Sequence, residues 1–239
     1  MTFRRLRSLV MLGASDSNLL WHLLWPVRLL LPLRADLRWT GYDKNHWEAE
    51  FAGGRWACLY SLEEAGHYYI IALYVKMFGG NGAILDVGCG EGILQSIVKP
   101  FGDAKYLGID LSENAIQVAS KKSNLHTSFL AVKAQEFMTE ERFNTIIFNE
   151  TLYYFPQPAK ILEYYAQFLS RNGVFIISMT LYGIGSGLLT LGIWRDIERY
   201  HVVLKEMVVH TKSGATWIVK VLKPNSYRAP TPLNPIAAM

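Results

Sequence analysis

The feature that most constrains the fold is the stretch ILDVGCGEGIL, residues 84–94, where three glycines alternate with other residues between an apolar run and a helix-like run. Gly88, Gly90 and Gly92 let the backbone approach a ligand closely or adopt positive φ angles. In open α/β sheets, ligands bind beyond the carboxyl ends of the strands, where such a loop joins a strand to a helix. The stretch therefore predicts a strand, a ligand-binding loop and a helix in succession.

Short apolar runs alternate with helix-like segments from residue 83 onwards. The expected strands cover 83–88, 105–110, 128–132, 143–149 and 173–179, and the expected helices cover 92–100, 112–122 and 158–170. Asn172 and Gly173 predict a turn before the fifth strand. The residues TKSG, 211–214, separate two more apolar runs, which is typical of a hairpin. We expect a parallel sheet with helices on both faces, closed by a late antiparallel hairpin.

The N-terminal region differs from the rest of the chain, because five of the seven tryptophans precede residue 60. We interpret residues 1–80 as a helical extension or lid, 81–223 as the ligand-binding domain, and the proline-rich 224–239 as a disordered tail. The apolar run 19–33 contains Pro26 and Arg28 and is shorter than the roughly 20 residues that span a membrane. Residues 1–34 are expected either to pack on the domain or to make peripheral membrane contact.

Charge and cysteine content narrow the class of protein. Residues 1–40 hold six arginines and two aspartates, whereas the 18 basic and 18 acidic residues of the remainder cancel. The main domain therefore has no basic surplus that would indicate a nucleic-acid partner. Two cysteines, Cys58 and Cys89, form no disulfide framework, which favours a cytoplasmic location. The six histidines show no metal-ligand spacing, so no metal site is expected.

The glycine loop departs from the common phosphate-binding patterns. A dinucleotide loop has a third glycine where this chain has Ile93, and the Gly-Lys-Ser/Thr of a P-loop is absent. Asp86, two residues before the first glycine, would repel a pyrophosphate but suits a cationic ligand. Asp110 ends the second strand and can accept both hydroxyls of a ribose. An adenosine-containing ligand is therefore expected, with NAD as a minor alternative.

Four stretches carry a family resemblance: ILDVGCGEGIL, YLGIDLSENAI, FNTIIFNETLYYF and LSRNGVFIISM. In order and spacing they resemble the class I S-adenosylmethionine-dependent methyltransferases, over about residues 82–223. The resemblance implies a Rossmann-like, doubly wound, seven-stranded, mostly parallel α/β sheet with a C-terminal antiparallel hairpin. It also implies S-adenosylmethionine as the cofactor. A looser resemblance links the flanking segments to sugar, amino-sugar and nodulation-type N-methyltransferases.

The resemblance also implies which residues bind the cofactor. Asp86 would order its amino group, Asp110 would accept the ribose hydroxyls and Leu111 would pack on the adenine. Lys133 stands where many relatives carry an acid, which moves adenine recognition to the next two residues. The full expected set is Asp86, Gly88, Cys89, Gly90, Gly92, Asp110, Leu111, Ala134, Gln135 and Asn149.

The expected reaction is methyl transfer to an oxygen or nitrogen atom of a small molecule, with a sugar or amino sugar preferred. Because an oxygen nucleophile usually needs a base, His67, Glu150 and Tyr154 are the catalytic candidates. The glycine-containing segment 181–194 is expected to be a mobile substrate loop. The alternatives are a non-catalytic cofactor-binding subunit and a nucleic-acid methyltransferase. The oligomeric state stays open.

Overall fold

The structure of the protein, a computed structural model, describes residues 43–99, 104–181 and 183–225. The elements, in chain order, are α3 (Lys44–Ala52), η3 (Arg55–Tyr60), α4 (Leu62–Tyr74), η4 (Val75–Gly79), β1 (Ile84–Val87), α5 (Ile93–Val98), β2 (Tyr106–Asp110), α6 (Glu113–Ala119), η6 (Ser120–Lys122), β3 (Thr127–Ala131), β4 (Phe143–Asn149), η7 (Leu152–Tyr154), α7 (Pro158–Ala166), β5 (Leu169–Thr180), α8 (Gly183–Glu198), β6 (His201–His210) and β7 (Thr216–Pro224).

The strands form one seven-stranded sheet in the order β3-β2-β1-β4-β5-β7-β6. All neighbouring pairs are parallel except β5–β7 and β6–β7. The predicted mostly parallel sheet with a C-terminal antiparallel hairpin is therefore confirmed. The direction in which strands are added reverses between β1 and β4, so their carboxyl ends flank the switch point where ligands bind in such sheets.

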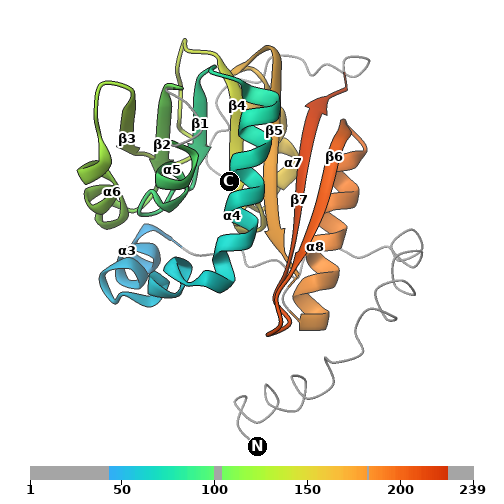
Figure 1. Cartoon of the computed structure of the whole chain (residues 1–239), viewed down its shortest axis with the longest axis horizontal. Helices are drawn as coiled ribbons and strands as arrows, with labels where there is room; N and C mark the ends of the chain where they lie inside the picture. Colours follow the sequence, from blue (N-terminus) through green and yellow to red (C-terminus); the bar gives the residue numbers. More distant parts are fainter. Residues whose placement is uncertain (1–42, 100–103, 182, 226–239) are drawn as a thin grey trace, which may run out of the picture.

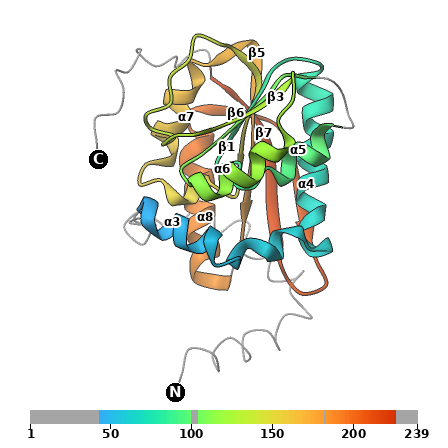
Figure 2. The same ribbon diagram turned by 90° about the vertical axis from the view of Figure 1, so that its left-hand side faces the viewer.

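Helices cover both faces of the sheet, as Figures 1 and 2 show. One apolar cluster joins α4 and α5 to the sheet through residues such as Ile71, Leu94 and Ile147. The other joins α7 and α8 to the opposite face through residues such as Tyr165 and Trp194. Figure 1 places α3 next to the carboxyl ends of β1 and β2, so this helix is positioned over the switch point.

Two local expectations were wrong. The strand β5 begins at Leu169 and continues through Asn172 and Gly173, where a turn was expected. Pairing of β5 with β4 shifts register between Phe143 and Thr145, and this irregularity absorbs the turn-forming residues. The segment 181–194, expected as a mobile loop, lies mostly in α8, because the helix buries Trp194 in the core. Tertiary packing here outweighs the low helix propensity of glycine.

Three expectations concern segments outside the described residues. The apolar run 19–33, with the membrane contact expected of residues 1–34, falls there, and so does almost all of the expected tail 224–239. Within the ranges that the structure describes, no helix has the length and apolar character of a membrane span.

Candidate functional site

A cavity of about 370 Å³ lies at the switch point. Nine of the ten expected cofactor residues line it: Asp86, Gly88, Cys89, Gly90, Asp110, Leu111, Ala134, Gln135 and Asn149. The catalytic candidates Glu150 and Tyr154 line it as well. Gly92 and His67 are the two expected residues that do not, so the structure brings together all the rest of the set.

The glycine loop adopts left-handed backbone conformations. The φ angles are 77° at Gly88, 52° at Gly90 and 72° at Gly92, a region that other residues rarely occupy. Gly92 precedes α5, and a Cβ there would stand 3.0 Å from the ring of Phe129. A glycine is therefore required at position 92 by the backbone conformation and by the close packing of Phe129. Gly92 does not line the cavity.

Asp110 holds the loop and keeps spare acceptor capacity. One carboxylate oxygen accepts a hydrogen bond from the Gly90 amide at 2.8 Å, and the other accepts from the Ser112 amide at 2.9 Å. An ionised carboxylate has about four acceptor positions, so about two remain. Burial raises the pKa of Asp110, although these bonds oppose the shift. The geometry suits a ligand that donates two hydroxyl hydrogen bonds.

Asp86 in β1 and Asn149 at the end of β4 place buried hydrogen-bond acceptors next to the glycine loop. The Asp86 side chain is almost completely buried and accepts a hydrogen bond from the Tyr106 hydroxyl through one oxygen. Its second oxygen, and Oδ1 of Asn149, have no partner within the described ranges. Burial raises the pKa of Asp86 to about 7. Buried acceptors without donors are costly, so a ligand that donates to them would stabilise this end of the cavity.

Glu150 has the one positive φ among the described non-glycine residues, at 56°. Its carboxylate accepts hydrogen bonds from the Ser178 hydroxyl at 2.8 Å, the Tyr153 hydroxyl at 3.0 Å and the Thr180 amide at 3.0 Å. Burial raises its pKa to about 7, against the effect of these bonds. The three bonds hold a strained backbone in place, as often occurs at functional sites. They also occupy both oxygens, so Glu150 shapes the site more readily than it accepts a proton.

The wall opposite the glycine loop is aromatic and comes partly from α3 and η3. The ring of Trp47 stacks on Trp56 at 6.0 Å and meets the edge of Tyr154 at 4.7 Å. A Cβ on Gly90 would lie 3.5 Å from the ring of Phe51, so this ring covers the loop. We call residues 43–60 the lid. It supplies Trp47, Phe51, Trp56, Cys58 and Leu59 to the cavity.

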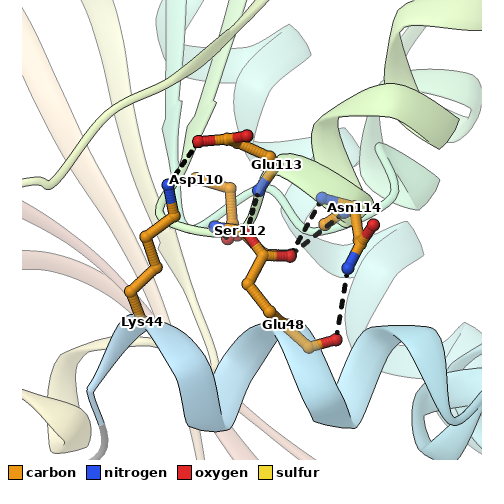
Figure 3. A network of polar contacts seen from close by, with 7 residues as sticks. Lys44, Glu48, Asp110, Ser112, Glu113 and Asn114 are labelled. Atoms are coloured by element: carbon orange, nitrogen blue, oxygen red, sulfur yellow. Dashed lines mark hydrogen bonds and ion pairs between the residues drawn. The ribbon is translucent and has the colours of Figure 1, made fainter.

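Glu48 attaches the lid to the start of α6, as Figure 3 shows. Its carboxylate accepts from the backbone amides of Glu113 at 2.7 Å and Asn114 at 3.1 Å, and from the Ser112 hydroxyl at 2.9 Å. These amides are among the four that the first turn of any helix leaves without an intrahelical acceptor. Asp110 satisfies the amide of Ser112. The lid and the expected ribose-binding carboxylate therefore share one helix terminus.

Other polar residues of the lid each make fewer contacts with the rest of the domain than Glu48 does. Lys44 forms an exposed ion pair with Glu113, of a kind that adds little stability. The Tyr60 hydroxyl donates to Glu91 at 2.7 Å. No residue of α3 is buried. An element with few buried contacts opens at low free-energy cost, so Glu48 is expected to be the main attachment of the lid.

Replacing Glu48 by alanine is therefore expected to release α3. Loss of a helix-capping side chain costs about 1 kcal/mol, so hydrogen exchange of the α3 amides should accelerate about fivefold. Hydrogen exchange measured by mass spectrometry checks this. The matched control is Glu50→Ala on the same helix, which removes only an exposed pair with Arg55 and should change exchange less than twofold. Equal acceleration in both variants would contradict the assignment.

His67 lies one layer behind the cavity wall. Its ring is completely buried and stacks on Trp217 at 4.9 Å, and its Nδ1 stands 3.7 Å from a carboxylate oxygen of Glu64. Burial lowers the pKa of His67 to about 3, so the ring is neutral. Glu64 and Trp217 line the cavity, whereas His67 does not. A catalytic role for His67 in direct contact with the acceptor stays a prediction. The buried position of the ring outside the cavity lining does not favour it.

Sequence reasoning proposed an extension or lid within residues 1–80 but named none of the lid residues that line the cavity, and it did not single out Glu64. The tryptophan cluster before residue 60 indicated a distinct region, but it did not indicate that this region contacts the start of α6. Glu48 contacts residues more than 60 positions away, and no local pattern reports such a contact. The side chain of Asp43 does accept from the His46 amide, a helix-start signal that was visible in the sequence.

Comparisons with known proteins agree with this geometry. Residues 79–209 match the family model described as a methyltransferase domain. The ubiquinone biosynthesis O-methyltransferase of Pasteurella multocida is 35% identical over 109 residues, covering 40% of this chain and 45% of that protein. The malonyl-[acyl-carrier protein] O-methyltransferase of Priestia megaterium is 34% identical over 91 residues, covering 37% and 33%. The chain thus spans less than half the length of these curated relatives.

Solved structures share the fold at low sequence identity. The N-methyltransferase NodS from Bradyrhizobium japonicum, in complex with S-adenosyl-L-homocysteine, superposes with a TM-score of 0.63 at 17% identity, covering 76% of this chain and 98% of that one. Magnesium protoporphyrin IX methyltransferase from Synechocystis, with bound SAM, gives 0.59 at 15% identity, covering 77% and 98%. At such identities the likeness is one of fold.

Proposed function

Because the chain belongs to the class I S-adenosylmethionine-dependent methyltransferases, we propose that it methylates a hydroxyl group of a small molecule that packs against aromatic rings. The observation that carries the proposal is a single cavity that joins the glycine loop and Asp110 to an aromatic end. Relatives named as O-methyltransferases support oxygen as the acceptor atom. Aromatic rings also suit stacking on a sugar face, so sugar hydroxyls stay within the proposed acceptor class.

The residues present fit the cofactor. Its ammonium group can donate to the buried oxygens of Asp86 and Asn149, which have no partner among the residues that the structure describes. Gly88 presents backbone without a side chain, and Asp110 has acceptor capacity left for two ribose hydroxyls. When bound, S-adenosylmethionine supplies an electrophilic methyl group on a positively charged sulfur.

The chain itself contributes position and shielding. Displacement at the methyl carbon requires the acceptor oxygen to approach in line, so an acceptor held on the aromatic wall gains rate through alignment. Trp47 and Tyr154, which meet edge to face, join the lid to η7 along the cavity wall. Tyr68 of α4 and Asn149 both line the cavity, so α4 also contributes to its cofactor end.

Binding of S-adenosylhomocysteine is expected to weaken at acid pH because of Asp86. The pKa of this acid is raised to about 7 in the folded protein, so it is ionised above pH 7 and protonated below. Only the ionised form pairs with an ammonium group. By linkage, affinity should fall by up to about tenfold per pH unit below pH 7 and level off above pH 8.

Calorimetric titration between pH 5.5 and 8.5 tests this, with Asp86→Asn as the comparison. The asparagine keeps the size of the side chain but cannot titrate, so its weaker binding should vary little with pH. Parallel pH curves for the two proteins would show that Asp86 is not the titrating group.

An acceptor screen tests the proposed reaction. Purified protein and S-adenosylmethionine are incubated with phenols, catechols, sugars and primary amines, and products are identified by mass spectrometry. Methylated phenols, catechols or sugars would support a hydroxyl acceptor. Methylation of the amines alone would contradict oxygen as the acceptor atom. Absence of any product, while the cofactor binds, would favour the alternative of a non-catalytic subunit.

Location and organisation follow as further proposals. The free thiols of Cys58 and Cys89 support a reducing, cytoplasmic setting. Peripheral membrane contact through residues 1–34 is proposed from their arginines and tryptophans. The division near residue 80 is proposed because the family match begins at residue 79.

A further inference from the structure

Proton removal from a hydroxyl acceptor needs a basic group with free lone pairs in the cavity. Among the described residues, five carboxylates line it: Glu64, Asp86, Glu91, Asp110 and Glu150. Both oxygens of Asp110 and both of Glu150 already accept hydrogen bonds. Glu91 accepts from the Tyr60 hydroxyl. Asp86 is bound by Tyr106 and buried at the cofactor end.

Glu64 differs from the other four. It lies in the first turn of α4, its side chain is 21% exposed, and its carboxylate accepts no hydrogen bond from the described part of the chain. Both of its oxygens therefore keep lone pairs for an acceptor. Burial, and next the charge of Glu63, raise the pKa of Glu64, which increases its affinity for a proton.

The position of Glu64 matches the acceptor end of the cavity. Glu64 and Tyr68 are four residues apart in α4 and so share one face of the helix, and both line the cavity together with Glu150. Asn149 lines the same cavity, which therefore continues from Glu64 and Tyr68 to the cofactor end. Trp217 and Tyr68, which line the same region, form apolar surface on which an acceptor can lie.

His67 stands directly behind Glu64. Its Nδ1 is 3.7 Å from Glu64 Oε2, and both ring nitrogens are buried without a hydrogen-bond partner in the described ranges. The stacking on Trp217 fixes the plane of the ring. A small movement of Glu64 would make a hydrogen bond that satisfies one of these nitrogens, for which the described residues offer no other polar partner.

We propose that Glu64 removes the proton from the acceptor hydroxyl and that His67 is a positioning residue that orients the Glu64 carboxylate. This inference rests on the proposed function. In the step, the acceptor oxygen forms a bond to the methyl carbon while the carbon–sulfur bond breaks and its electron pair stays on sulfur. The hydroxyl proton passes to Glu64, from which solvent removes it.

A pair of phenols of different acidity tests the role of Glu64. At pH 8.5, 4-methylphenol is neutral and needs a base, whereas 4-nitrophenol is largely ionised and does not. A general base contributes about 100-fold or more. Glu64→Gln should therefore lower kcat with 4-methylphenol at least about 100-fold. With 4-nitrophenol, kcat should stay close to that of the unmodified protein, and so should affinity for S-adenosylhomocysteine.

Control variants separate this role from a structural one. Glu140→Gln makes the same charge change at an exposed position outside the cavity lining and should leave both phenols unaffected. His67→Phe keeps a ring beside Trp217 but removes the nitrogens, so it should lower kcat selectively with 4-methylphenol, less than Glu64→Gln does. Equal losses with both phenols, or no loss, would overturn the assignment of Glu64. If the unmodified protein binds S-adenosylhomocysteine but methylates neither phenol, Glu64→Gln and Glu140→Gln are compared on the catechol or sugar that the acceptor screen finds to be methylated, and an unchanged kcat of Glu64→Gln there would overturn the assignment.

Discussion

Replacement of Asp110 by alanine is expected to weaken binding of S-adenosylhomocysteine at least about 100-fold, because hydrogen bonds to a charged group contribute about 1.5–3 kcal/mol each and two ribose donors would lose their acceptor. The backbone amides of Gly90 and Ser112 would lose the same acceptor, so the loop would also be less well ordered before binding. Calorimetric titration measures the change.

The control for Asp110 is Asp196→Ala on α8, which removes an acid outside the cavity lining and should leave affinity within twofold. Thermal unfolding of both variants separates loss of binding from loss of fold. If the Asp110 variant is folded and binds within threefold of the unmodified protein, the ribose assignment is wrong.

Replacement of Gly88 by alanine is expected to destabilise the fold itself. A non-glycine residue at its φ of 77° costs about 1–2 kcal/mol. A Cβ would also stand 2.5 Å from Cγ2 and Oγ1 of Thr151, and overpacking of this kind costs about 1–3 kcal/mol more. The melting temperature should fall by about 4–20 °C, since the two costs together are about 2–5 kcal/mol and each kcal/mol shifts it by about 2–4 °C in a protein of this size.

Two comparison variants divide this loss into its causes. Gly54 also has a positive φ, of 65°, but a Cβ there meets nothing within 4 Å. Gly54→Ala should therefore show only the backbone cost. The double variant Gly88→Ala with Thr151→Ala removes the two clashing atoms and should recover part of the loss. A Gly88 variant as stable as the Gly54 variant would contradict the close approach of Thr151.

The fold and the cofactor end of the site were largely predictable because their signals are local. The succession of strands and the glycine loop follow from short-range patterns, whereas the set of cofactor residues follows from the family resemblance. The structure places nearly all of these residues around one cavity. The expected turn at Asn172 and Gly173 failed because pairing with β4 extends β5 through it. The expected loop 181–194 failed because burial of Trp194 favours a helix.

The acceptor end was harder to predict because it depends on long-range contacts. Glu64 and His67 are three residues apart in α4 and lie on one side of the helix, so helical periodicity brings them together. Which of the two reaches the cavity is decided by Trp217 of β7, more than 140 residues later, since it stacks on the histidine. The lid depends likewise on Glu48 meeting the amides of α6, which no pattern near Glu48 reveals.

The central claim is that the cavity binds S-adenosylmethionine and transfers its methyl group. Calorimetric titration of the full chain with S-adenosylhomocysteine, and with NAD in parallel, tests the binding half most directly. We expect saturable binding of S-adenosylhomocysteine with a stoichiometry of one per chain and no heat of binding from NAD. Binding of NAD alone, or of neither compound, would contradict the account of the glycine loop, Asp86 and Asp110.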